Sequence, residues 1–226
     1  MAKQKNSFWT YFLEILVVII GISVAFALER WTSVNKENQL EANYKTSLVA
    51  DLKKDVEDLQ LVINSTNTII RNIGEVFQYN FGNASVDAYK RRHVVSTYLA
   101  TYFYPQNSTY VSLINSGDIS VIKEFLLKTT LSNHYNINYV ELERTDQLIK
   151  NLAYNMIQPY MIDNIEFSMR GDGIGNAKPL KTNQATNMIG SMFNLLSGRQ
   201  QAYRALMKDC EDLIKLIEDK KECIYT

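Results

Sequence analysis

The first distinct pattern along the chain is a dense apolar run near its N-terminus. Within residues 6–28 the only charged side chain is Glu14. A helix needs about 20 mostly apolar residues to cross a bilayer, and this run meets that length. The sequence therefore predicts a transmembrane helix over residues 8–31. Aromatic side chains that mark the two membrane interfaces stand near its ends: Trp9, Tyr11 and Trp31.

A cleaved signal peptide is the competing interpretation of this run. The tripeptide at residues 25–27, Ala-Phe-Ala, resembles a small-x-small cleavage site. The aromatic lead-in, the acidic Glu14 inside the run and the closing Trp31 are not typical of a signal peptide. We therefore expect an uncleaved anchor.

Basic residues near the anchor predict its orientation. Lys3 and Lys5 precede the helix, and the positive-inside rule then places residues 1–7 in the cytoplasm. Arg30 and Lys36 on the other side partly offset that asymmetry. The rest of the chain is expected on the far side of the membrane.

Four positions of the anchor share one helix face: Glu14, Val18, Gly21 and Ala25. Gly21 and Ala25 form a small-xxx-small pair, which lets two membrane helices approach closely. A carboxyl at membrane depth is costly and usually faces protein or water. We interpret this face as a helix-packing face that docks on another membrane helix. The alternative is that Glu14 reaches the lipid headgroups.

Beyond the anchor the pattern is that of amphipathic helices. Apolar residues recur at mostly three- and four-residue steps over residues 44–77, with charged residues between them. Nothing in residues 31–40 breaks a helix decisively, so the anchor is expected to continue into a long stalk. Asp51, Asp55 and Asp58 share a spacing that could hold a cation. Because two lysines lie among these aspartates, we interpret this face of the helix as an ordinary solvated charged surface.

The remaining pattern predicts further helices and the loops between them. The helices are expected over residues 86–104, 108–115, 118–156 and 182–222, with loops near 79–86, 104–108 and 160–182. Gly117 is expected to stop the short second one in a left-handed conformation, and Pro159 to close or kink the third. Amphipathic helices joined in this way bury their apolar faces best when they pack as a bundle. The predicted fold class is all-α: a transmembrane helix that continues into a stalk, followed by an extramembrane antiparallel helical bundle over residues 32–226.

Composition and cysteine spacing narrow the function classes. The 226 residues carry 24 basic and 24 acidic side chains, a formal net charge of zero, which argues against a nucleic-acid partner. Cys210 and Cys223 would lie about 20 Å apart on one helix, too far for a disulfide. Cys210 falls on an apolar stripe and is expected to be buried. Cys223 is either free or pairs with another copy.

No catalytic, cofactor-binding or metal-binding residue is predicted, and the protein is not expected to be an enzyme. His93 and His134 have no second ligand at metal spacing. The glycine-rich residues 171–175 follow no strand and lack a P-loop lysine, so they indicate a turn. Four tyrosines around Pro105 form a possible partner surface, with core packing as the alternative: Tyr98, Tyr102, Tyr104 and Tyr110.

Two blocks of the sequence, residues 11–22 and 109–119, together resemble an uncharacterised family of small single-pass membrane proteins in Bacteroidota. The chain departs from that pattern at Leu13, where the family tends to have glycine, and at residues 29–30, where asparagines are usual. The resemblance implies a bacterial inner membrane with the folded domain in the periplasm. It implies no activity, because none is established for the family.

These observations lead to two hypotheses of different classes. The first is a non-enzymatic accessory or assembly subunit of an inner-membrane complex. Its expected partners are the lipid bilayer, another membrane protein or a second copy through the anchor, and a periplasmic protein. The second is a periplasmic ligand-sensing bundle that signals through a partner protein.

Overall fold

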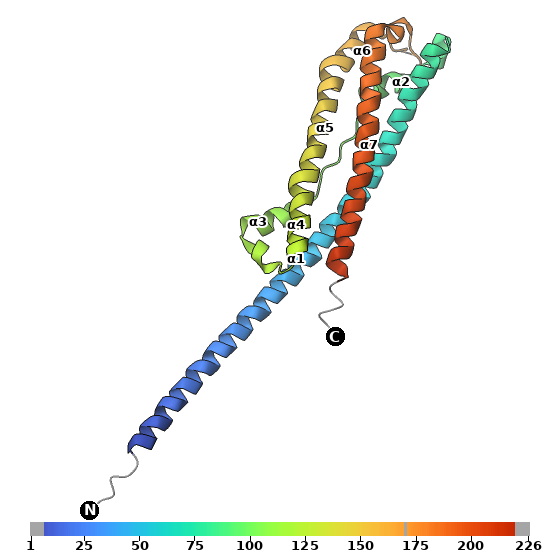
Figure 1. Ribbon diagram of the computed structural model, residues 1–226. Coiled ribbons are helices and arrows are strands. Elements are labelled where there is room, and N and C mark those ends of the chain that lie inside the picture. The colour runs from blue at the N-terminus through green and yellow to red at the C-terminus, as the bar shows by residue number, and fades with distance from the viewer. Residues whose placement is uncertain (1–6, 170, 220–226) are drawn as a thin grey trace, which may run out of the picture.

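The chain is all-helical in a computed structural model that describes residues 7–169 and 171–219. Its dominant element is α1, which runs from Ser7 to Phe81 over 75 residues. Figure 1 shows the N-terminal part of α1 projecting away from the other helices and its C-terminal part packed among them. The anchor and the stalk are thus one unbroken helix. The residues assigned to the cytoplasm before Ser7, and Cys223, lie outside the described residues.

Six further α-helices follow α1 in the part of the chain that the structure describes. Short 3-10 turns and π turns connect some of them, and the described residues contain no strand, only two isolated bridges. The helices are α2 (Arg91–Ser96), α3 (Ser108–Asn115), α4 (Phe125–Asn133), α5 (Tyr139–Leu152), α6 (Gln158–Asn164) and α7 (Asn183–Glu218).

The core lies where α7 packs against both the C-terminal half of α1 and α5 (Figure 1). Thr182 caps α7, because its hydroxyl accepts a hydrogen bond from the Ala185 amide at 3.2 Å. The apolar stripe expected on this last helix is buried against α1 and α5, apart from Phe193, which is partly exposed. Cys210 belongs to that stripe and is fully buried, which confirms its predicted place.

The helix predicted over residues 86–104 is wrong. Only residues Val86–Ala88 and α2 are helical there, and residues 97–107 run in an irregular extended path. We call residues 97–107 the strap. Figure 1 shows it crossing from α2, near the far end of the molecule, to α3, near the point where α1 leaves the domain.

Local chemistry ends α2 and extends the strap. The Thr97 hydroxyl donates to the Val94 carbonyl at 2.6 Å, which competes with further helical bonding. Tyr104 precedes Pro105, and a residue in that position is disfavoured in the helical region. Two amide groups farther along the strap, those of Phe103 and Gln106, then bond to side chains of the long helices α7 and α1.

The helix predicted to start at Asp118 begins later and contains two irregular turns. Gly117 has φ 77°, as expected, but Asp118–Val121 forms a 3-10 turn and α4 starts only at Phe125. From α4 to α6 the chain stays helical through two π turns, His134–Asn138 and Ala153–Ile157. Pro159 therefore does not close the helix. The π turn ahead of it pairs Gln158 N with the carbonyl five residues back, and α6 continues to Asn164.

Candidate functional site: a buried polar network beneath the strap

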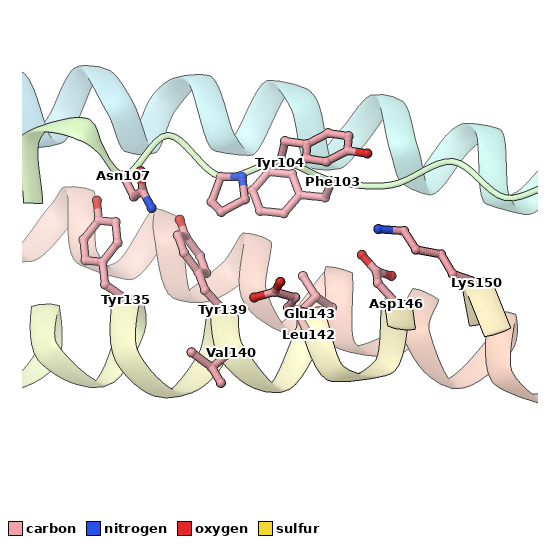
Figure 2. Close-up of a pocket in the computed structure, with 11 residues that line it drawn as sticks. Phe103, Tyr104, Asn107, Tyr135, Tyr139, Val140, Leu142, Glu143, Asp146 and Lys150 are labelled. Atoms are coloured by element: carbon pink, nitrogen blue, oxygen red, sulfur yellow. The ribbon is translucent and has the colours of Figure 1, made fainter. Parts of the chain in front are cut away.

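The strap covers a groove on the side of α5 (Figure 2). We call this cavity, about 310 Å³ in volume, the strap groove. Its upper wall is strap residues and its floor is α5 with the π turn before it. The lining residues are Phe103, Tyr104, Pro105, Asn107, Tyr135, Tyr139, Val140, Leu142, Glu143, Asp146 and Lys150.

Asp55 of α1 holds the strap from behind. Its carboxylate is fully buried and accepts hydrogen bonds from the Gln106 amide at 2.8 Å and the Tyr139 hydroxyl at 2.5 Å. Burial raises the pKa of Asp55 to about 6, against the lowering effect of these two donors. The solvated charged face expected here is therefore wrong for Asp55, which faces inward. Asp51, one turn earlier, accepts from the Thr109 amide at 3.2 Å and so caps α3.

His134 extends this network toward α7. Its Nε2 lies 2.9 Å from the Tyr139 hydroxyl oxygen and 3.7 Å from Cys210 Sγ. Because the phenol proton of Tyr139 is donated to Asp55, His134 fits best as the Nε2–H tautomer, donating to the phenol oxygen. Its Nδ1 is buried without a partner among the described residues. Desolvation lowers the pKa of His134 to about 4, so the imidazole is neutral at pH 7.

A buried ion pair lies farther along the same groove. Arg199 of α7 is 1% exposed, and its Nη1 donates to Asp146 Oδ1 of α5 at 2.9 Å. The Tyr203 hydroxyl also contacts Asp146, at 3.4 Å, and accepts from the strap amide of Phe103 at 3.3 Å. The guanidinium of Arg199 lies over the rings of Tyr102 and Tyr203, at 5.3 and 5.2 Å.

The chemistry available to this network is proton storage and strap positioning. Burial raises the pKa of the Cys210 thiol to about 12, so it is protonated and a poor nucleophile near neutral pH. Within residues 7–169 and 171–219 no three His, Cys, Asp or Glu side chains gather closely enough to bind a metal. Asp55, by contrast, changes its charge near pH 6. The strap is thus attached through one carboxylate that titrates in a mildly acidic range.

The four tyrosines of the possible partner surface are separated by the fold. Tyr110 is buried and stacks on Tyr135 at a centroid distance of 4.3 Å. Tyr98 and Tyr102 are half-buried against the core. Tyr104 alone is widely exposed, at 70%, and it forms the rim of the strap groove. Core packing thus accounts for Tyr110, and the partner surface stays a prediction that rests on Tyr104.

The predicted anchor residues all lie on the projecting part of α1. Because that helix is unbroken, Glu14, Val18, Gly21 and Ala25 fall within about 60° of one another around its axis. All four are exposed, as are the interface aromatics Trp9, Tyr11 and Trp31. Nothing described in the chain contacts the place where a side chain at position 21 would point.

Sequence reasoning missed the groups that form the buried network. They are Asp55, His134, Tyr139, Asp146 and Arg199. Three of them are charged residues that occupy positions of an apolar stripe. Asp55 stands between Leu52 and Leu59, Asp146 between Leu142 and Ile149, and Arg199 between Leu196 and Tyr203. A charge at such a position is a signal for a buried partner.

These features define a class: an all-helical protein whose long first helix is apolar and exposed at its N-terminal end and joins the packed core at its other end. The chain belongs to a family of unknown function, DUF6090, whose model matches residues 14–157. The match confirms membership of an uncharacterised family and includes the strap and Asp55, whereas α7 lies outside it. No curated protein and no solved structure matches the chain.

Two titratable groups of the network, His134 and Asp55, should respond to acid in opposite directions. His134 has a folded-state pKa below its ordinary 6.5, so its contribution to stability is lost as the pH falls from about 6.5 to 4. Asp55 has a folded-state pKa above 3.8, so folding gains stability as the pH falls through about 6. In the wild type these two effects largely cancel.

Single substitutions should separate these effects. The measurement is urea unfolding of the detergent-solubilised chain at pH 7 and pH 5. On going from pH 7 to pH 5, the free energy of unfolding of His134→Gln should rise by about 2 kcal/mol relative to that of the wild type. Asp55→Asn should lose about 1 kcal/mol in the same comparison. Shifts of the same sign for both variants would contradict the assignment of the two pKa values.

Proposed function

We propose that the protein is a single-pass accessory or assembly subunit of a bacterial inner-membrane complex. The observation that carries the proposal is the exposure of the apolar run. An 18-residue window there has a mean hydropathy of 2.5, and none of it is buried within the protein. Soluble proteins rarely expose apolar surface of this extent. At about 1.5 Å per residue such a window is about 27 Å long, close to the thickness of a bilayer's hydrocarbon core.

In this proposal α1 is both anchor and spacer. The apolar segment ends at Leu28, and α1 first packs against the rest of the domain near Leu40. The exposed polar helix between them would hold the domain roughly 15 Å from the bilayer surface. Lys3 and Lys5 favour a cytoplasmic N-terminus and a periplasmic helical bundle.

The docking face of the anchor is the one that carries Glu14, Gly21 and Ala25. Its support is that these residues have no contact within the chain, although Glu14 would need a polar partner at membrane depth. A neighbouring membrane helix that approaches Gly21 and supplies a donor to Glu14 satisfies both requirements. In this proposal the missing side chain at Gly21 allows a partner helix to approach closely, because no described residue of this chain packs against that position.

The test is a mild-detergent pull-down of the full chain followed by mass spectrometry. We expect a stoichiometric membrane partner, or a second copy of the chain, that is lost in Glu14→Gln and in Gly21→Ile. Ser23→Ile is the matched control, because it adds bulk on the opposite side of the same helix. Equal recovery of partners by all three variants would refute docking through this face.

Insertion of α1 in the bilayer makes its own prediction. Replacing both Ile19 and Ile20 with arginine should release the protein into the soluble fraction on alkaline carbonate extraction, because each central arginine costs about 2.5–3.5 kcal/mol on insertion. The control, Val34→Arg together with Ser33→Arg, charges the exposed stalk and should stay in the pellet. A wild-type chain that carbonate extracts completely would contradict the anchor.

A ligand-sensing bundle is the second candidate function, and the strap groove is the observation that favours it. The groove lies between the strap, an extended segment, and α5 with the π turn before it. A ligand bound there would contact the strap directly. If the protein is a ligand sensor, ligand binding should raise its melting temperature. An assembly subunit does not require such a ligand.

A further inference from the structure

The strap groove carries a further inference. The chemistry of the ligand is argued from the lining of the groove, and only its source, solution or lipid, rests on the proposed membrane anchor. Aromatic rings form much of its wall: Phe103 and Tyr104 come from the strap, and Tyr135 and Tyr139 from the opposite helix. Figure 2 shows the strap side chains above and the helix side chains below, with space between the two rows. Aromatic faces carry negative electrostatic potential and attract cations.

One polar atom in this groove has no partner in the described chain. Tyr135 is 7% exposed, and its hydroxyl makes no hydrogen bond. Figure 2 shows that hydroxyl turned toward the strap at the end of the groove near Asn107. A buried polar group without a partner destabilises the folded state, so a ligand that bonds to this hydroxyl would recover the lost free energy.

The charges around this end of the groove favour a cation. Glu143 is exposed at the groove and has no ion pair among the described residues. Asp55 and Asp51 lie behind the tyrosines. Burial raises the pKa of the Tyr135 phenol, and the charges of these two carboxylates raise it further. The groove's one lining cation, Lys150, sits farther along α5 with its Nζ 4.5 Å from the Tyr102 ring centre.

We propose that the strap groove binds a small organic ammonium ion. The rings of Tyr104 and Phe103 contact the cation from the strap, Glu143 balances its charge, and the Tyr135 hydroxyl bonds to a polar group of the ligand. A volume of about 310 Å³ suits a small molecule. Were α1 inserted in a bilayer, the level of Asp55 would lie roughly 40 Å along the helix from Leu28, beyond the reach of lipid headgroups. The ligand is therefore a soluble one.

Isothermal titration of the full chain in maltoside micelles tests the proposal with choline as the probe. Its neutral isostere, 3,3-dimethylbutan-1-ol, has the same shape and hydroxyl but no charge. We expect choline to bind at one site per chain and the isostere to bind at least about tenfold more weakly. Glu143→Gln and Tyr104→Ala should each weaken choline binding by about tenfold. Tyr135→Phe should also weaken choline binding, and choline should still bind more tightly than its isostere.

Glu141→Gln provides the matched control. Glu141 is also an exposed carboxylate of α5, two residues away, but it lines a different surface depression. Both Glu143 and Tyr104 are exposed, so these variants should fold, which far-ultraviolet circular dichroism checks. No binding of choline, equal binding of choline and its isostere, or equal losses in Glu141→Gln and Glu143→Gln would each overturn the proposal.

Discussion

Replacing Arg199 with methionine should lower the free energy of unfolding by about 3–5 kcal/mol, because Asp146 would keep a buried charge without a partner. Asp146 is 5% exposed and receives its short contact from Arg199 Nη1 at 2.9 Å. Burial already raises the pKa of Asp146, and the nearby guanidinium is what opposes that rise. The measurement is urea unfolding of the detergent-solubilised chain, followed by near-ultraviolet circular dichroism.

A second substitution distinguishes a lost ion pair from lost packing. In Arg199→Met combined with Asp146→Leu, both charges are gone, and most of the lost stability should return. Arg144→Met changes an exposed arginine on the same α5 and should stay within about 0.5 kcal/mol of wild type. If the double variant is as unstable as Arg199→Met alone, the effect comes from packing and the ion-pair explanation fails.

The sequence was most informative where helices are long and their apolar stripes regular. The unbroken course of α1 follows from the lack of glycine and proline over residues 22–73. The inner face of α7 follows from the three- and four-residue spacing that includes Leu196, Leu206 and Cys210. In both helices local propensity and burial favour the same structure, and the prediction needs no knowledge of the rest of the fold.

The strap could not be predicted because its hydrogen-bond partners are distant in sequence. Gln106 bonds to Asp55, and Phe103 bonds to Tyr203, whose hydroxyl lies one hundred positions farther along the chain. Residues 86–104 carry an apolar spacing that suits a helix, and no local pattern reveals acceptors supplied by α1 and α7. Tertiary contacts override local preference at this point.

The two π turns escaped detection for a related reason. A π turn adds one residue to a helix without a characteristic residue type, so the spacing on either side still indicates a helix. The first turn begins at His134 and includes Tyr135, and Tyr139 follows directly after it. The candidate site is thus built largely where the helix geometry departs from regularity, which sequence periodicity does not record.

Asp55→Ala should release the strap and lower the free energy of unfolding by about 3 kcal/mol. Two buried donors, the Gln106 amide and the Tyr139 hydroxyl, would lose their acceptor, at about 1–3 kcal/mol each. The strap itself gives a second readout. Amide hydrogen exchange at Gln106, and chymotrypsin cleavage after Phe103, which is buried while the strap is attached, should both accelerate before the helices unfold.

Asp58→Ala is the matched control, since Asp58 lies on the same helix and its one ion pair among the described residues is with the exposed Lys54. Its loss should stay within about 0.5 kcal/mol and leave cleavage after Phe103 unchanged. Faster global unfolding of Asp55→Ala with unaltered exchange at Gln106 would show that Asp55 stabilises the helices and not the strap. Faster exchange confined to the strap would instead mark Asp55 as its attachment point. Choline titration of that variant would then report how far the strap groove depends on that attachment.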